Sequence, residues 1–230
     1  MNVLWLQSAG CGGCTMSLLC AEGPGVFDLL GNAGISFLWH PALSEQSGGE
    51  VRKLLTQVET GELPLDVLCV EGSILTGPKG TGKFQILSGT GRSMLDWVQS
   101  LAPRARHVVA VGTCATYGGV TSAGGNPAGA IGLQFDGQQP GGALPEDFRS
   151  QSGLPVINVA GCPTHPDWVT ETLLLLAAGE MSQDDLDRLH RPLFYAEHLV
   201  HHACPKNEFY EYKASAEKLS QMGCMMEHLG

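Results

Sequence analysis

The chain opens with Asn2-Val3-Leu4-Trp5-Leu6-Gln7-Ser8-Ala9-Gly10-Cys11-Gly12-Gly13-Cys14-Thr15, a stretch that joins a short apolar run to a glycine-rich turn with two cysteines. The run has no polar alternation, as expected of a parallel strand that is covered on both faces. A strand that leads into a turn and then a helix is the repeating unit of parallel α/β sheets. We therefore predict an α/β fold and look for further units of this kind.

Four more short runs rich in Val, Ile and Leu follow, at residues 35–39, 65–70, 107–111 and 155–159. Between them, apolar residues spaced three and four apart predict helices at residues 51–59, 92–102 and 168–178. A further helix is expected over residues 15–30, with an interruption near Gly23-Pro24-Gly25. This alternation predicts five parallel strands with helices between them.

The pattern changes in two places. Residues 118–153 are rich in Gly, Pro, Asn and Gln without periodicity, which predicts a long irregular loop. After Gly179 we expect an acidic helix over residues 181–189 and then a tail with His and Cys. We place a domain boundary near residue 190, with one domain over residues 1–189 and the start of a second over residues 190–230.

The composition of the 230 residues limits the partners. A formal net charge of -10 disfavours nucleic acid and anionic membranes, which bind clustered Lys and Arg. Only 16% of the residues are charged and 43% are hydrophobic, so we expect a partner that covers apolar surface. No apolar run is long enough to span a bilayer. The strand that starts at residue 2 leaves no room for a signal peptide, so we expect a cytoplasmic location.

Cysteines follow three of the predicted strands. Cys11 and Cys14 come after the first strand, Cys114 after the fourth and Cys162 after the fifth. Because open parallel sheets bind ligands at the carboxyl ends of their strands, we expect these four thiols to meet at one edge. The chain has eight cysteines, and in a reducing compartment metal binding is favoured over disulfides.

Four thiolates can hold either a tetrahedral zinc ion or an iron–sulfur cluster. One Cys11-x-x-Cys14 pair, completed by two distant single cysteines with neighbouring glycines, favours the cluster. Zinc, or an unliganded cysteine cage in a regulatory binding module without a redox role, stays open as the alternative. A thioredoxin-type motif would explain only the Cys11-x-x-Cys14 pair.

Other residues give weaker signals. Glu71 ends the third strand at the same edge, either near the metal cluster or as an acid that closes a turn or caps a helix. Residues 77–83 have P-loop spacing, but Phe84 stands where Ser or Thr should bind magnesium, which disfavours nucleotide binding. Cys20 and Cys69 lie in apolar runs and are expected to be small buried hydrophobes.

The tail holds a second candidate metal site. His201-x-x-Cys204 is followed about twenty residues later by Cys224, a spacing that suits metal ligands. A fourth ligand is not evident from the spacing, and surface histidines with free cysteines are the alternative.

With these residues assembled, the chain resembles the small subunit of nickel-iron hydrogenases over essentially its whole length. The segments that carry the resemblance are Cys11-Gly12-Gly13-Cys14-Thr15-Met16, Val70-Glu71-Gly72, Gly112-Thr113-Cys114-Ala115, Gly161-Cys162-Pro163, Arg191-Pro192 and His201-x-x-Cys204 with Cys224. The resemblance implies a flavodoxin-like domain with a proximal 4Fe-4S cluster on Cys11, Cys14, Cys114 and Cys162. It also implies a second, distal 4Fe-4S cluster at His201, Cys204 and Cys224.

The resemblance further implies a large-subunit partner that carries the nickel-iron centre, while this chain transfers electrons in the oxidation or sensing of hydrogen. Members of the family continue with a fourth distal ligand and a three-cysteine region, so we expect the second domain to be truncated. Because no twin-arginine signal is visible, the chain looks most like the cytoplasmic hydrogen-sensing, regulatory subgroup. Its partners would then include a signalling histidine kinase.

Overall fold

The computed structural model describes residues 1–198, 204, 207–218 and 220–224. The chain divides into two compact units, Met1–Pro192 and Leu193–Gly230. The first unit contains the sheet and all the cysteines that follow its strands. Among the described residues, no helix has the length and apolar character needed to cross a membrane.

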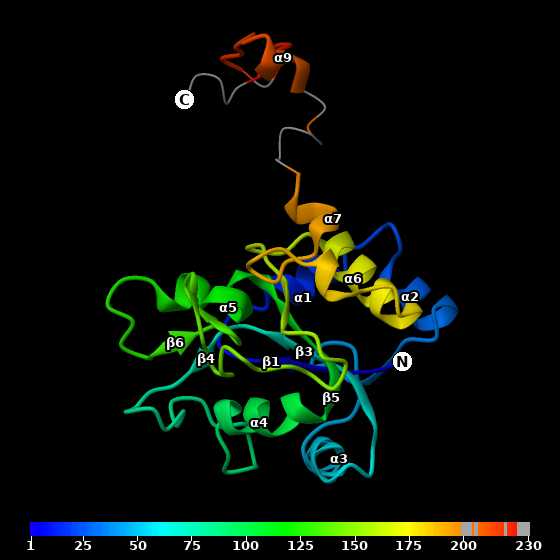
Figure 1. The fold of residues 1–230 in the computed structure, drawn as a ribbon, viewed down its shortest axis with the longest axis vertical. Coiled ribbons are helices and arrows are strands. Elements are labelled where there is room, and N and C mark those ends of the chain that lie inside the picture. The colour runs from blue at the N-terminus through cyan, green and yellow to red at the C-terminus, as the bar shows by residue number, and fades with distance from the viewer. Residues whose placement is uncertain (199–203, 205–206, 219, 225–230) are drawn as a thin grey trace. The chain divides into compact units, whose positions relative to one another are not determined.

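The centre of the first unit is a five-stranded parallel sheet in the order β2-β1-β3-β5-β9 (Figure 1). Its strands are β1 (Asn2–Gln7), β2 (Ser36–Trp39), β3 (Leu65–Glu71), β5 (Ala105–Val111) and β9 (Ile157–Val159). These are the five predicted strands, with ends that differ by up to two residues. The strand order is that of the flavodoxin-like doubly wound sheet, so the predicted fold class is confirmed.

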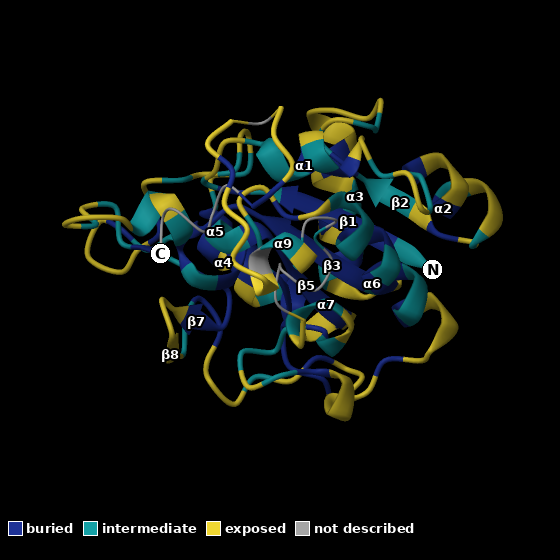
Figure 2. Cartoon of the chain, turned by 90° about the horizontal axis from the view of Figure 1, so that it is seen from above, coloured by how far each residue is buried: buried dark blue, intermediate teal, exposed yellow. Residues whose placement is uncertain are grey.

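Helices cover both faces of the sheet (Figure 1). On one side lie α1 (Gly13–Leu18), α2 (Val26–Asn32) and α6 (Pro166–Ala178), and on the other α3 (Gly49–Thr60) and α4 (Met94–Leu101). The strands β1, β3, β5 and β9 are largely buried, whereas β2, at one edge of the sheet, is only half-buried (Figure 2). Because side chains alternate along a strand, Leu4 and Leu6 of β1 pack with α3 and α4 in one apolar core.

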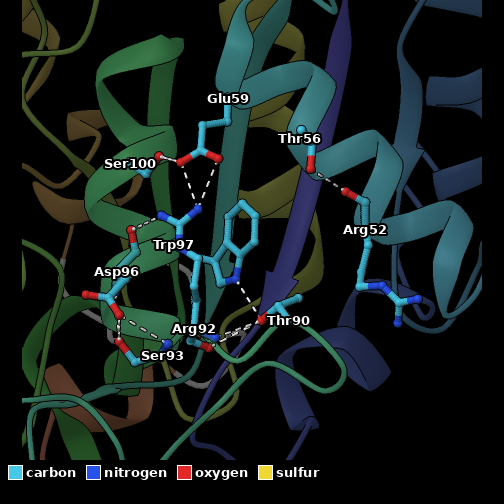
Figure 3. A network of polar contacts seen from close by, with 9 residues as sticks. All are labelled: Arg52, Thr56, Glu59, Thr90, Arg92, Ser93, Asp96, Trp97 and Ser100. Carbon is cyan, nitrogen blue, oxygen red and sulfur yellow. Dashed lines mark hydrogen bonds and ion pairs between the residues drawn. The ribbon is translucent and has the colours of Figure 1, made fainter.

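A polar network ties α3 to α4 at the rim of that core (Figure 3). Arg92 donates to both carboxylate oxygens of Glu59, at 2.8 and 3.0 Å, and its guanidinium lies 4.0 Å from the centre of the Trp97 ring. Ser100 donates to the same carboxylate. The hydrogen bond from Ser100 and the charge of Arg92 lower the pKa of Glu59, so the two helices share one ionised acceptor.

The predicted irregular excursion over residues 118–153 contains only short elements. They are η2 (Gly119–Ser122), β6 (Ala130–Ile131), β7 (Phe135–Asp136) and β8 (Gln139–Pro140), with β6 paired to β4 (Ile74–Leu75). The helix α5 (Gly112–Tyr117) precedes it, directly after β5. The helix expected over residues 15–30 is divided into α1 and α2.

The acidic helix predicted over residues 181–189 is wrong. Only a short 3-10 turn, η3 (Gln183–Asp185), is present, and a similar turn, η1 (Ala102–Arg104), follows α4. Asp187 accepts from the backbone N–H groups of Leu189 and Arg191 and pairs with the Arg191 guanidinium at 2.6 Å. An aspartate that accepts backbone hydrogen bonds two and four residues ahead stabilises a turn in place of a helix.

The second unit is small. Its described elements are α7 (Leu193–Ala196), α9 (Asn207–Glu211) and a bridge between Ser215 and Cys224.

Candidate metal-cluster site

The turns that follow β1 and β3 are joined by hydrogen bonds. Ala9 and Ser73 exchange backbone hydrogen bonds of 3.1 and 2.8 Å, and the Ser8 hydroxyl donates to the Ser73 carbonyl at 2.7 Å. Between the two turns lies Gly72, at a φ of 87°. A Cβ there would lie 2.8 Å from the Ser8 carbonyl carbon, so only glycine allows the turns to approach this closely.

Glu71, the last residue of β3, holds the first cysteine-bearing turn in place. Its Oε1 accepts from the backbone N–H groups of Cys14 and Thr15 at 3.1 and 3.0 Å. Its Oε2 accepts from the Trp5 indole N–H at 3.2 Å and from the Thr15 hydroxyl. The side chain is 2% exposed. This geometry is that of an acid capping α1, one of the two roles considered for Glu71.

The turn after β5 brings Cys114 towards Cys14. A Cβ on Gly112, whose φ is 84°, would lie 2.3 Å from the Cys14 sulfur. On the other side of Cys114, a Cβ on Gly119 would lie 2.9 Å from the Cys114 sulfur. Both glycines therefore leave space that the two thiols occupy.

The turn that bears Cys162 is bonded to both of the others. Thr113 donates its backbone N–H to the Gly161 carbonyl at 2.8 Å and accepts the Gly161 N–H on its hydroxyl at 3.1 Å. Ser17 of α1 donates to the Thr164 carbonyl at 2.7 Å. The segments that carry the four predicted cysteine ligands are thus hydrogen-bonded neighbours at the carboxyl edge of the sheet.

The four thiols differ in exposure. Cys11 and Cys162 are exposed, whereas Cys14 and Cys114 are half-buried. The pKa of Cys14 is raised to about 11, chiefly by burial and also by the nearby Glu71, Cys114 and Cys11, while a hydrogen bond from the Thr164 backbone lowers it. A metal that binds here must therefore displace a proton from Cys14.

The two remaining cysteines of this unit, Cys20 and Cys69, do not lie in the turns at the carboxyl edge of the sheet. Cys69 is fully buried in β3, as predicted. Cys20 is exposed, which contradicts the prediction that it is a buried hydrophobe. It follows the end of α1, and its thiol reaches back to the Met16 carbonyl at 3.5 Å, so it lies on the outer side of a helix that is only six residues long.

Within the described residues, no three His, Cys, Asp or Glu side chains converge closely enough to bind one metal ion. A four-iron cluster makes a different demand, because each of its ligands binds a separate corner of the cage. Three turns supply four cysteine sulfurs, which are the ligands that iron–sulfur clusters use. Each of the three turns also contains glycine, which lets the backbone come close to a bound cluster.

The P-loop spacing at residues 77–83 does not form a phosphate-binding loop. Gly77 pairs with Ala128 at 2.9 Å, and Phe84 donates back to the Gly77 carbonyl. The next helix, α4, begins only at Met94. Because no helix N-terminus follows the loop, the feature that holds phosphate in P-loops is missing.

Two residues beneath the cysteine turns carried no signal in the sequence. Trp5 fixes Glu71 through its indole N–H, and the fully buried His40 ring packs on Trp5, with ring centres 4.9 Å apart. The apolar run that contains Trp5 identified the strand but not its hydrogen bond.

The candidate residues in the tail are only partly described. His201 lies outside the described residues. Cys204 is half-buried, and Cys224 is buried in the bridge to Ser215. The distal site therefore stays a prediction.

A flavodoxin-like sheet with cysteine-bearing turns along one carboxyl edge defines a class of α/β proteins suited to metal clusters, and comparison with known proteins narrows it. Residues 11–176 match the family described as NADH ubiquinone oxidoreductase, 20 Kd subunit. The small subunit of the periplasmic [NiFeSe] hydrogenase of Desulfomicrobium baculatum is 31% identical, over 98% of this chain and 71% of that protein. The chain belongs to this family and, within it, to the small subunits of nickel-iron hydrogenases.

Other similar proteins are also named as hydrogenases or their small subunits. F420 non-reducing hydrogenase I small subunit of Methanosarcina mazei is 31% identical over 91% of this chain. The actinobacterial-type NiFe-hydrogenase of Ralstonia eutropha H16 has a TM-score of 0.82 at 31% identity, covering 98% of this chain and 68% of that one. This chain spans 58% and 62% of the two Methanosarcina mazei small subunits that it matches.

Proposed function

We propose that this chain is the electron-transferring small subunit of a nickel-iron hydrogenase and binds a proximal 4Fe-4S cluster through Cys11, Cys14, Cys114 and Cys162. When bound, the cluster accepts and releases single electrons. The catalytic nickel-iron centre would lie on a large-subunit partner. The observation that carries the proposal is the contact of the Cys14 sulfur with Gly112, two residues before Cys114.

In this proposal the protein positions and insulates the cluster. Glu71 fixes the backbone of Cys14 and Thr15, so one of the four ligands, Cys14, is held before the cluster arrives. The glycines beside the ligands let backbone N–H groups approach the sulfides, which stabilises an anionic cluster.

Exposed apolar side chains on the same segments support a protein partner at this edge. Met16 on α1 is 65% exposed, Leu19 just after it 43%, and Val120 in η2 69%. Large exposed apolar residues near a redox site are typical of a surface that another subunit covers. A large subunit seated there would also shield the cluster from solvent.

The finer assignments are part of the proposal. We place the distal 4Fe-4S cluster at His201, Cys204 and Cys224 and regard residues 190–230 as the start of its domain. The cytoplasmic location and the hydrogen-sensing role with a histidine kinase stay predictions, since relatives named above are periplasmic or F420 non-reducing enzymes. Cell fractionation and hydrogen-dependent kinase assays test them.

The test is the iron and sulfide content of the chain purified with its partner. Cys114→Ser should lose or convert the cluster and reduce the dithionite-bleachable absorbance near 400 nm. Cys20→Ser is the matched control, because Cys20 is exposed and lies outside the turns at the carboxyl edge of the sheet that carry the four proposed ligands. Unchanged iron in Cys114→Ser would contradict the ligand set. A colourless protein that contains zinc would favour the regulatory binding module.

A further inference from the structure

The opposite end of the sheet has a groove that the proposed function does not use. Three cavities of 620, 440 and 260 Å³ share Arg106 as a common lining residue, at the start of β5. The 620 Å³ cavity is also lined by Arg104, and the other two by His107. Cavities of several hundred Å³ are large enough for a small molecule.

The groove holds positive charge that is not neutralised locally. Arg104 and Arg106 are exposed, and within the described part of the chain neither guanidinium forms an ion pair. Asp66 lies beside Arg106 in the neighbouring strand, but its Oδ2 accepts the Asn2 backbone N–H at 2.6 Å. That hydrogen bond leaves the carboxylate its one negative charge, which offsets one of the two positive charges, in a chain whose net charge is -10.

A buried histidine lines the same groove. His107 is 6% exposed, and its Nδ1 has no hydrogen-bond partner among the described residues. Burial and the neighbouring Arg106 lower the pKa of His107 to about 4. The Nδ1 is itself closed to solvent, so a ligand in the groove would not bond to it, but the ring follows Arg106 in β5 and lines two of the three cavities.

We propose that this groove binds a small molecule bearing a carboxylate or phosphate, held by the guanidinium of Arg106, which lines all three cavities, and by that of Arg104 in the 620 Å³ cavity. The planar guanidinium matches the two oxygens of either oxyanion. The site is independent of the cysteine edge, because β5 separates the two by seven residues, or about 20 Å at 3.3 Å per residue. An anion at this distance would not contact the cluster ligands.

The test is calorimetric titration of the full chain with pyrophosphate and, separately, with citrate, which distinguishes phosphate from carboxylate ligands. We expect saturable binding of at least one, weakened tenfold or more in Arg106→Gln. Lys53→Gln removes one exposed positive charge from α3 outside the groove and should bind as the parent does. The side-chain NMR signals of His107 should shift on binding in the parent.

Three results would overturn the proposal. They are no saturable binding of either anion, equal binding by the parent and Arg106→Gln, and binding that leaves the His107 signals unmoved. An equal loss in Lys53→Gln would also count against it, because it would indicate a general charge effect.

Discussion

Replacing Glu71 by alanine tests how the cysteine turn is held. The carboxylate accepts the backbone N–H groups of Cys14 and Thr15 and the indole N–H of Trp5. Each buried donor left unpaired costs about 1 kcal/mol or more, so Glu71→Ala should lower the free energy of unfolding by about 3 kcal/mol. Glu71→Gln keeps one oxygen for the α1 N–H groups but turns an amide towards Trp5, so we expect a loss of about 1 kcal/mol.

The assay is denaturant unfolding of the iron-free, thiol-reduced chain, followed by cluster reconstitution. Glu146→Ala, at an exposed acid in the irregular loop, is the control and should change neither quantity. In Glu71→Ala we expect slower and less complete iron uptake, because the Cys14 backbone is no longer fixed. A variant as stable as the parent, with the same rate of iron uptake, would refute the idea that Glu71 organises the turn.

Three further predictions concern other parts of the chain. Gly112→Ala places a Cβ 2.3 Å from the Cys14 sulfur at a φ of 84°, so the iron content of the purified chain should fall. Gly80→Ala is the control, because a Cβ there meets no atom within 4 Å, and it should leave the iron content unchanged. Ser100→Ala should raise the pKa of Glu59 and cost about 1 kcal/mol of stability, measured by denaturant unfolding; no change would contradict the shared-acceptor interpretation. Burial lowers the pKa of His40 to about 4, below its unfolded value of about 6.5, so stability should fall as pH decreases between these values. His40→Phe should make that dependence less steep, with the contribution of His107 remaining, and an unchanged slope would refute the role of His40.

The sheet could be predicted from the sequence because four of its five strands, all but β2, are largely buried. Runs such as residues 65–70 have no polar alternation, a pattern that few other elements produce. The cysteine edge followed from topology alone, since parallel strands end on the same side. The contact of Cys14 with Gly112 agrees with that reasoning.

The parts that could not be predicted depend on individual side-chain bonds. The acidic segment after Gly179 has helix-forming residues, but Asp187 satisfies the backbone of Leu189 and Arg191 and so forms a turn. Cys20 follows an apolar run, yet α1 ends before it and leaves it exposed. The bond from Trp5 to Glu71 joins residues 66 apart, which no local pattern reveals.

The measurement that tests the central claim most directly is iron, sulfide and zinc quantification on the chain co-purified with the proposed large subunit. Low-temperature EPR of the dithionite-reduced protein accompanies it. A proximal cluster predicts about four irons and four sulfides for that site, and a reduced-cluster signal that disappears in Cys114→Ser but persists in Cys20→Ser. Stoichiometric zinc without iron, or an identical signal in Cys114→Ser, would contradict it.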